Sequence, residues 1–528
     1  MNTAAPKAIP AQRSWTDTVP WVAFGLFIVL TGMLVPRHEL WRDESADWLY
    51  TRWGISLADV LHHLGYQMDP GGWHTALYFL AKVFPTPLAM QIFHSLMAIG
   101  GVFLFIRYAP FSRLEKCLYP FGYFVFFEYN IIARNYVPIL LFLAAIAVVY
   151  EGRFSRPWRH VLLIFLLAHS HMFGTIFAST LTMLYGIELL ARHRFRWREY
   201  RPYVLPLLAL GAGFAVSLYQ MFPFAEAREN MSGGGDIDYF QTTRGILLHW
   251  VAPVIKPQFY FWPVSTVSDS HSTLLALVYL IGILYVVHPR PVPLAYFAAT
   301  GGIYMYMLVF KGSNPRFIGM LFVLLIFTLW LGRFYPYAKR LEGSRWLAWY
   351  PRIRRGLVVA LLTLQAVSAP TVFWLDYHYP FSGGKETAQF LNEEIRGTNV
   401  LMGSLLSYAS QSIQPYLRDD LPALYCLETQ EFYRGLIHNL QWYQNDKKTS
   451  PNQAIQRLQQ KAREGSYDRV FLITLLPLQT DALRVLGVFP ADGRVLSGDE
   501  RFFVHEMDKR LYRGPMAPAG AGPWGPRK

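Results

Sequence analysis

Charged residues are scarce in this chain of 528 residues, of which 16% are charged and 53% are hydrophobic. A soluble protein of this size needs more charge on its surface. The apolar residues also fall in blocks of about 20, the length that crosses roughly 30 Å of hydrocarbon. A soluble domain instead spaces its apolar residues periodically, because one face must meet water. The composition therefore predicts an α-helical polytopic membrane protein.

Cysteine is also rare, since only Cys117 and Cys426 occur. We expect them on opposite sides of the membrane, and therefore no disulfide within the chain. A signal-peptide cleavage pattern is absent too, because the first apolar run, over 19–36, has no small-residue exit site. We predict that this run is retained as the first span.

Positive charge is present, and it lies in short segments between the apolar blocks. The formal net charge is +14, a balance that also occurs in proteins that bind nucleic acid. Basic clusters between spans are typical of loops on the cytoplasmic side. The charge therefore indicates membrane topology, and we expect no nucleic-acid partner.

Eleven apolar blocks are predicted to be transmembrane spans. They lie near 18–36, 86–107, 117–131, 135–150, 160–170, 171–191, 203–222, 272–288, 293–310, 316–333 and 357–375. With a cytoplasmic N-terminus, eleven spans place every basic cluster inside. The alternative is one broken helix over 160–191, which would invert the later loops and put the most basic one outside.

Three long segments are then expected on the outer face, namely 37–85, 223–271 and everything after 376. Three consecutive glycines at 233–235 indicate a flexible loop tip, which either gates a substrate site or simply connects two spans. After 376, strand-like runs near 398–404, 468–475 and 501–507 alternate with helical patterns near 384–396, 430–444 and 452–464. We predict a membrane domain over 1–376, a soluble α/β domain over 377–512 and a disordered tail over 513–528.

The first candidate site residues are Asp43 and Glu44, which follow Arg42 just after the first span. A carboxylate near a membrane surface can have a raised pKa and can serve as a general base for a hydroxyl nucleophile. The alternative is an ordinary solvated pair of loop acids. Asp47 and Asp69 are further candidates on the same grounds.

Two further groups lie at the ends of apolar runs, where ionisable residues are costly. The first contains Glu128, Arg134 and Tyr136, and the second contains Lys311, Asn314 and Arg316. Arg134 can offer a planar fork to phosphate oxygens, and Arg316 could lie beside it as a second phosphate ligand. The alternative for both arginines is an anchor at the level of the lipid headgroups.

Histidines form the last group, with His169 and His171 at the junction of the fifth and sixth spans and His74 before the second. A His-x-His pair is compatible with zinc. No third ligand with suitable spacing follows, so we favour hydrogen bonding to a substrate phosphate or between helices.

Taken together, these pieces resemble the GT-C superfamily of integral-membrane glycosyltransferases. The resemblance is to its bacterial branch, which is similar to protein O-mannosyltransferases and lipid A aminoarabinose transferases. The matching segments are WRDES at 41–45, HTALY at 74–78, ARNY at 133–136, HSH at 169–171, PRF at 315–317 and SGGKETAQFL at 382–391. The second of these corresponds to a His-Pro-Pro-Leu-Tyr element and lacks both prolines.

The resemblance implies a GT-C fold of about eleven transmembrane helices in a bacterial inner membrane, with the C-terminal domain in the periplasm. It implies an inverting transfer of a sugar from a polyprenyl-phosphate donor to a hydroxyl of a glycan, lipid or protein acceptor. Asp43 would be the base, and Glu44 would orient the acceptor or a metal. Arg134 and Arg316 would bind phosphate. The supporting site residues would be His74, His171, Glu128, Tyr136 and Lys311.

Two other functions remain open at this stage. A lipid or oligosaccharide transporter or flippase would also have many spans, although the sequence shows no inverted repeat. A polysaccharide polymerase or ligase would use a pyrophosphate-linked donor. We predict no cofactor, because two arginines can neutralise the phosphate, and a divalent metal is the alternative.

Overall fold

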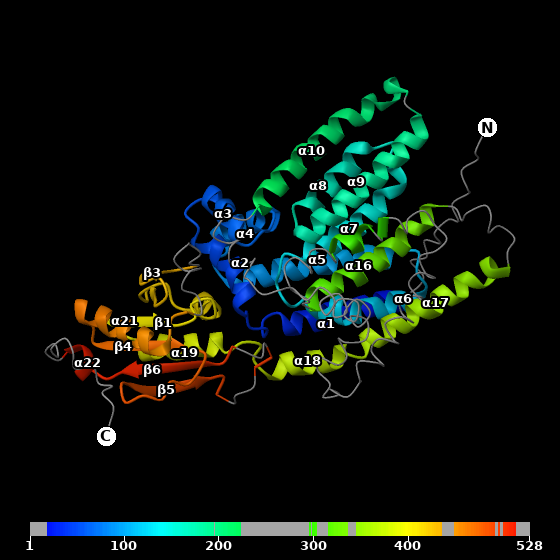
Figure 1. The fold of residues 1–528 in the computed structure, drawn as a ribbon. Coiled ribbons are helices and arrows are strands. Elements are labelled where there is room, and N and C mark those ends of the chain that lie inside the picture. The colour runs from blue at the N-terminus through cyan, green and yellow to red at the C-terminus, as the bar shows by residue number, and fades with distance from the viewer. Residues whose placement is uncertain are drawn as a thin grey trace, which may run out of the picture. The chain divides into compact units, whose positions relative to one another are not determined.

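A computed structural model describes residues 18–194, 196–222, 295–296, 298–303, 315–335, 345–435, 448–491, 495–496 and 500–513. The span predicted at 272–288, the outer loop at 223–271, Lys311, Asn314 and all but the first residue of the tail at 513–528 lie outside these residues. The chain divides into two compact units (Figure 1). Unit 1 contains Met1–His38 and Ile55–His378, and unit 2 contains Glu39–Gly54 and Tyr379–Lys528.

All the regular secondary structure in the described residues of unit 1 is helical. Its α-helices are α1 (Thr18–Leu34), α3 (Leu57–His63), α4 (Gly72–Val83), α5 (Pro87–Tyr108), α6 (Arg113–Leu118), α7 (Val137–Val149), α8 (Pro157–Ala168), α9 (Met172–His193), α10 (Arg201–Met221), α16 (Pro315–Leu331), α17 (Arg345–Ala366) and α18 (Ala369–His378). Helices α8, α9 and α10 contact one another and lie side by side in Figure 1.

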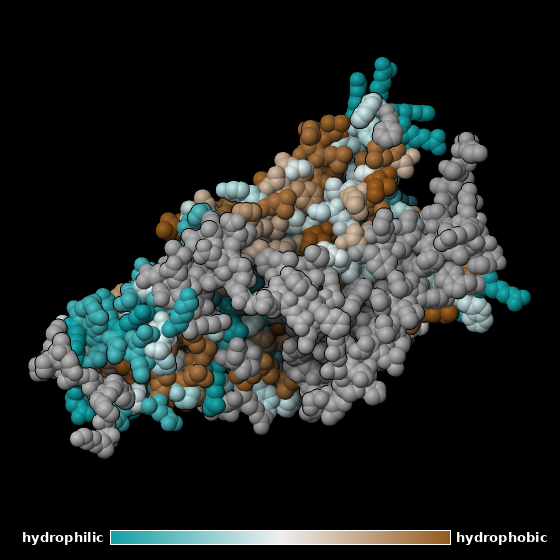
Figure 2. All heavy atoms as spheres, in the orientation of Figure 1, coloured by the Kyte–Doolittle hydropathy of each residue, from teal (hydrophilic) through white to brown (hydrophobic). Residues whose placement is uncertain are grey.

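Several of these helices can cross a membrane. Four helical stretches are long and apolar enough, namely Pro87–Tyr108, Met172–His193, Trp197–Met221 and Leu347–His378, and four shorter apolar helices accompany them. Apolar side chains such as Val204, Leu205 and Leu208 on α10 are exposed. Figure 2 shows hydrophobic residues over α8 to α10 and hydrophilic residues beyond their ends. These features support a polytopic membrane protein, while the number of eleven spans stays a prediction.

One predicted span is wrong in its detail. The block at 117–131 is not a continuous helix, because α6 ends at Leu118 and is followed by a 3-10 turn over Tyr119–Phe121 and a π-helical turn over Phe124–Glu128. Pro120 has no N–H to donate and so interrupts the helix. By contrast, 160–191 does form two helices, α8 and α9, as the eleven-span interpretation requires.

A buried ion pair joins the first and last helices of unit 1 where the chain leaves it. His38 follows α1 and Asp376 lies in α18, and His38 Nδ1 is 2.9 Å from Asp376 Oδ1. Both side chains are fully buried. The His38 carbonyl also accepts a hydrogen bond from Gln91 Nε2 on α5 at 2.9 Å. The pair therefore holds together two segments that are separated by more than three hundred residues.

Unit 2 contains a mixed six-stranded sheet. The strands are β1 (Val400–Ser404), β2 (Leu424–Cys426), β3 (Glu431–Tyr433), β4 (Arg469–Thr474), β5 (Leu483–Phe489) and β6 (Phe502–Met507), and the helices are α2 (Arg42–Trp53), α19 (Gly384–Glu394), α21 (Pro451–Glu464) and α22 (Arg510–Arg513). The spatial order is β3-β2-β1-β4-β6-β5, with β1 parallel to both of its neighbours. The other pairs are antiparallel.

Side-chain alternation builds one core on each face of this sheet. Phe471 and Ile473 of β4 pack in the same cluster as Leu391 of α19. Val470 and Leu472 pack in the same cluster as Leu458 of α21. The period of two along each strand thus explains why helices cover both faces.

The predicted strands near 398–404, 468–475 and 501–507 are confirmed as β1, β4 and β6. The helix predicted at 430–444 is wrong at its start, because β3 occupies Glu431–Tyr433, while residues 436–447 lie outside the described part of the chain. Two residues of β3 are exposed on an edge strand, so its sequence lacks the apolar pattern that would identify it.

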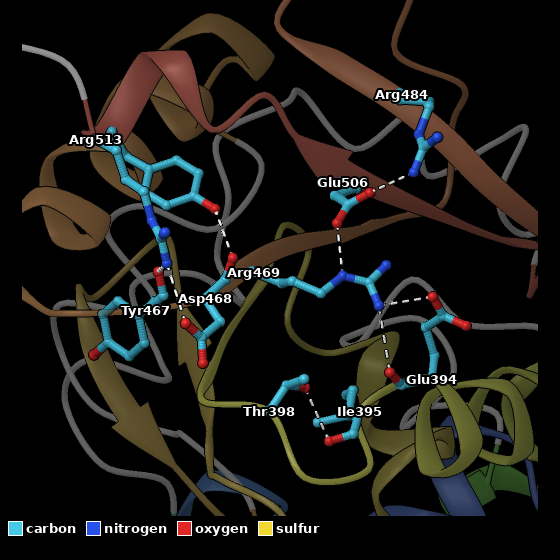
Figure 3. Close-up of polar contacts among 10 residues, drawn as sticks. Glu394, Ile395, Thr398, Tyr467, Asp468, Arg469, Arg484, Glu506 and Arg513 are labelled. Carbon is cyan, nitrogen blue, oxygen red and sulfur yellow. Dashed lines mark hydrogen bonds and ion pairs between the residues drawn. The ribbon is translucent and has the colours of Figure 1, made fainter.

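An arginine at the start of β4 ties together three elements of unit 2 (Figure 3). Arg469 Nε lies 2.6 Å from Glu506 Oε1 on β6, and its Nη1 lies 2.7 Å from Glu394 Oε1 at the end of α19. Arg484 on β5 also binds Glu506, at 2.6 Å. Burial raises the pKa of Glu506, but the hydrogen bonds from Arg469 and Arg484 outweigh it, and the pKa is lowered overall.

The His38–Asp376 pair provides a stability prediction. We expect Asp376→Ala to lower the free energy of unfolding by about 3 kcal/mol, because it leaves a buried imidazole without its partner. His38→Ala should cost a similar amount, and the double variant should cost less than the sum of the two. Thermal unfolding of the full chain in detergent measures this coupling. Strictly additive losses would show that the pair does not stabilise the fold.

Candidate functional site

A close approach of two backbones positions one part of the candidate site in unit 1. The Gly72 N–H at the start of α4 donates to the carbonyl oxygen of His169 at 3.0 Å. A Cβ at Gly72 would lie only 2.3 Å from that oxygen. The preceding N–H, of Gly71, donates to Gln220 Oε1 on α10 at 2.9 Å. Glycine is therefore required here, and the Asp69-Pro70-Gly71-Gly72 loop is held against the ends of α8 and α10.

This loop brings Asp69 to His171. Asp69 Oδ1 lies 3.5 Å from His171 Nε2, and both side chains are buried. His171 is the N-cap of α9, and its Nδ1 accepts a hydrogen bond from the Phe173 N–H at 3.1 Å. Because Nδ1 is an acceptor, the neutral imidazole carries its proton on Nε2, facing Asp69. The helix cap thus sets the direction in which His171 can donate.

A second buried pair joins the π-helical turn to α16. Arg316 Nε is 3.6 Å from Glu128 Oε1, and neither side chain is more than 8% exposed. The Tyr123 hydroxyl donates to Glu128 Oε2 at 3.2 Å, and the Tyr129 hydroxyl donates to the carbonyl oxygen of Arg316. Removing one member of such a pair would leave an uncompensated buried charge.

Aromatic rings connect the two pairs. The Tyr136 ring centroid lies 4.4 Å from that of His171 and 6.1 Å from that of Tyr129, which is next to Glu128. The ring of Phe317, which follows Arg316, is 6.4 Å from Tyr136 and 5.3 Å from Phe173. We call the following set the charged cluster of unit 1: Asp69, Glu128, Tyr136, His171 and Arg316, together with Arg134, which precedes Tyr136 by two residues in the chain.

All six residues of the charged cluster were candidates from the sequence, with Asp69 as a further candidate beside Asp43 and Glu44. Arg134 is half-buried in the turn that leads to Tyr136 and α7. Arg316 was expected beside Arg134, and the contact that the structure provides is with Glu128. His74 is fully buried in the first turn of α4. Lys311 lies outside the described residues.

Sequence reasoning missed Asn135, which lies between Arg134 and Tyr136. Its side chain is fully buried, and neither amide atom has a hydrogen-bond partner among the residues that the structure describes. Such a group is rare in folded proteins and calls for a specific explanation. A bound polar group could satisfy it, and no spacing pattern in the sequence marks this residue.

The predicted acids Asp43 and Glu44 belong to unit 2, in the first turn of α2. Glu44 is buried and its Oε2 accepts a hydrogen bond from the Trp41 N–H at 3.4 Å, so it caps its own helix. The Asp43 side chain is 37% exposed and lies 4.0 Å from Arg42 Nε. Of the two, Asp43 is the carboxylate that solvent or a substrate can reach.

A third carboxylate at this helix end was not expected from the sequence. Glu500 is fully buried, and its Oε1 accepts from the Arg42 N–H at 2.9 Å while its Oε2 accepts from Ser382 Oγ at 2.6 Å. Burial raises the pKa of Glu500 to about 7, against the lowering effect of those two hydrogen bonds. Glu500 therefore anchors the N-terminus of the helix that carries Asp43.

No group of three or more His, Cys, Asp or Glu side chains that could hold a metal ion occurs in the described part of the chain. His169 and His171 do not converge on one point, because His171 faces Asp69 while the His169 ring lies against Phe165, 4.4 Å away.

No protein-family model and no curated protein matches the chain, and two of the solved structures that are similar to it are described here. One is ArnT from Cupriavidus metallidurans bound to undecaprenyl phosphate, with 11% identity and a TM-score of 0.48, covering 95% of this chain and 100% of that one. The other is the arabinofuranosyltransferase AftD from Mycobacteria, with 11% identity and a TM-score of 0.34, covering 92% of this chain and 40% of that one. An identity of 11% does not assign a role to any single residue of this chain. The roles proposed below therefore rest on the contacts within the chain.

Glu500 provides a pH prediction. The folded chain keeps a proton on this carboxyl up to about pH 7, whereas the usual pKa is 4.5. Stability should therefore fall as the pH rises between these values, by about 3 kcal/mol in total. Glu500→Gln can accept from the Arg42 N–H through Oε1 and donate to Ser382 Oγ through Nε2, as a protonated carboxyl does. We expect this variant to match the wild type near about pH 5 and to exceed its melting temperature near about pH 8. Parallel melting curves across this range would contradict the assignment.

Proposed function

We propose that the protein is an inverting glycosyltransferase that moves a sugar from a polyprenyl-phosphate donor to an acceptor hydroxyl. We place the reaction on the periplasmic face of a bacterial inner membrane. The observation that carries the proposal is the charged cluster of unit 1, in which Asp69, Glu128 and Arg316 are buried in a bundle of apolar helices. Ionisable groups in such surroundings are costly and are usually functional.

The net charge of this cluster suits a phosphate. The guanidinium groups of Arg134 and Arg316 balance the carboxylates of Asp69 and Glu128, so the cluster is neutral before the donor binds. A sugar phosphodiester brings one negative charge, and a second one develops on the phosphate as it leaves. Guanidinium groups bind phosphate oxygens through a planar fork, and prepositioned charges of this kind often contribute most to catalysis.

The buried amide of Asn135 supports the same assignment. Its Nδ2 is a donor without a partner among the described residues, and it belongs to the same turn as Arg134. A phosphate oxygen would satisfy this donor, which otherwise pays the full cost of desolvation.

The chemical step is a single displacement. Asp43 takes the proton of the acceptor hydroxyl, and the hydroxyl oxygen forms a bond to the anomeric carbon. The bond between that carbon and the phosphate oxygen breaks, and its electron pair leaves with the polyprenyl phosphate. Attack from the face opposite the leaving group inverts the anomeric configuration. Asp43 then loses its proton to water.

Donor chemistry separates this proposal from its rivals. Purified protein with an envelope extract as acceptor should release free polyprenyl phosphate from polyprenyl-phosphate mannose, glucose or aminoarabinose. A transporter would leave all three donors intact. Turnover of a pyrophosphate-linked sugar with none of the monophosphates would favour a polymerase or ligase.

Asp43→Asn tests the base. We expect the rate of sugar transfer in proteoliposomes to fall about 10²- to 10⁴-fold, because an amide cannot accept the proton of the hydroxyl. Asp481→Asn, which changes an exposed carboxylate of the same unit, is the matched control and should retain the wild-type rate. An Asp43→Asn variant with full activity would rule out this role.

Arg134→Gln tests the phosphate ligands. We expect kcat to fall about 10²- to 10³-fold, the usual effect of losing one group that stabilises transition-state charge. Arg201→Gln, at an exposed arginine in the first turn of α10, removes the same charge elsewhere and should leave kcat unchanged. An equal effect of both substitutions would mean that only the overall charge matters.

A further inference from the structure

The charge of the helical hairpin formed by α8 and α9 is confined to one end. Residues 151–199 contain seven arginines, no lysine and three glutamates, which gives a net charge of +4, and 160–187 contain no Asp, Glu, Lys or Arg. The charged end is the one at which α8 begins and α9 ends. Figure 2 shows hydrophilic residues there, beyond the hydrophobic residues that cover the helices. No arginine of this end belongs to the charged cluster.

Most of this positive charge faces solvent. Six of the seven arginines are exposed, and we call them the basic surface: Arg156, Arg159, Arg192, Arg194, Arg196 and Arg198. Among these six, only Arg196 pairs with a carboxylate of the described residues, that of Glu199 at 3.3 Å. The seventh arginine, Arg153, is half-buried and makes two contacts of 2.8 Å with the carboxylate of Glu188. The basic surface therefore keeps positive charge that the described part of the chain does not neutralise.

Tyrosine hydroxyl groups hold the loop before α8 in place. Tyr185 of α9 donates to the carbonyl oxygen of Arg153 at 3.0 Å, and Tyr203 of α10 donates to that of Phe154 at 3.2 Å. The Arg192 guanidinium carbon, in the last turn of α9, lies 4.9 Å from the centroid of the Phe154 ring. The arginines are thus presented from a fixed backbone, so less freedom is lost when an anion binds.

The position of Arg159 does not stabilise its own helix. This residue lies in the first turn of α8, which has no side-chain hydrogen bond at its N-cap. The helix macrodipole is positive at that end, so it repels a guanidinium group and attracts an anion. An external negative charge would compensate both the arginine and the helix end.

Two exposed tryptophans flank the basic surface. The exposed fraction is 51% for Trp158 and 79% for Trp197. Tryptophan is enriched where the hydrocarbon of a bilayer meets the headgroups. The 22 residues of α9 extend about 33 Å, enough to cross the hydrocarbon. These features indicate that the basic surface lies at the level of the lipid headgroups.

We propose that the basic surface binds the headgroups of anionic phospholipids in the bilayer around the helices. A guanidinium fork fits the oxygens of a phosphate, and basic segments next to membrane helices attract anionic lipids. The bound headgroups would fix the depth of α8 and α9 in the bilayer. The inference does not depend on sugar transfer, because the charged cluster and the basic surface have no residue in common.

Native mass spectrometry of the full chain in neutral detergent tests the inference, because it resolves each bound lipid. The probes are phosphatidylglycerol, which is anionic, and phosphatidylcholine, which is zwitterionic. We expect phosphatidylglycerol to bind at least about tenfold more tightly, because each arginine near an anionic headgroup contributes about fivefold. Arg156→Gln/Arg198→Gln should weaken the binding of phosphatidylglycerol about tenfold or more and leave that of phosphatidylcholine unchanged.

Two control variants accompany this measurement. Arg396→Gln/Arg501→Gln removes the same charge at two exposed arginines of unit 2 and should bind phosphatidylglycerol like the wild type. Arg156→Lys/Arg198→Lys keeps the charge and should retain most of the binding, so it excludes misfolding as the cause of a loss.

Four outcomes would overturn the inference. The first is equal affinity for the two lipids, and the second is an equal loss of binding in the unit 2 variant, which would mean that only the overall charge matters. The third is a full loss of binding in the lysine variant. The fourth is displacement of phosphatidylglycerol by inorganic phosphate more strongly than by chloride at the same ionic strength, which would mean a site for a small anion.

Discussion

Charge buried inside an apolar helical bundle is stable only when an opposite charge or hydrogen-bond donors surround it. In unit 1 this requirement is met by Glu128 with Arg316 and by Asp69 with His171. Each pair draws its members from segments far apart in the chain. The interruptions of helical structure occur where these residues lie: a π-helical turn ends at Glu128, a Gly-Gly loop presents Asp69, and a helix cap places His171. π-Helical turns often occur at functional sites for this reason, since they redirect side chains that a regular helix would place elsewhere.

The acidic motif after the first span has a different structural context. Residues Glu39–Gly54 belong to the compact unit that contains the sheet, although the sequence places them between two membrane helices. Buried Glu500 accepts a hydrogen bond from the first N–H of α2. The orientation of Asp43 therefore depends on the folding of the C-terminal region, which links unit 2 to the proposed chemistry. Glu44, the neighbouring acid, is used to cap the helix.

Much of this molecule follows from local sequence. The length of the apolar blocks predicts helices such as α1, α5 and α9, because hydrophobic length and helix formation depend on consecutive residues. The apolar, β-rich runs at 468–475 and 501–507 likewise predict β4 and β6. The exposed edge strand β3 has no apolar run that would predict a strand. The helix break at Pro120 is marked in the sequence only by a single proline within an apolar block. The sequence also indicated which polar residues lie at the ends of apolar runs, and among them were Glu128, Arg134, Tyr136, His171 and Arg316.

Only the tertiary structure decided how those residues are combined. It paired Arg316 with Glu128, brought Asp69 to His171, and placed α2 in the unit of the sheet. It also revealed two buried residues. Glu500 has hydrogen-bond partners that are distant in the chain, and Asn135 has none among the described residues. No local pattern contains this information, because burial and the pairing of residues hundreds of positions apart result from packing of the whole chain. The sequence by itself indicated helices such as α5 and α9 and the strands β1, β4 and β6, because these depend on consecutive residues, and packing determined which charges meet.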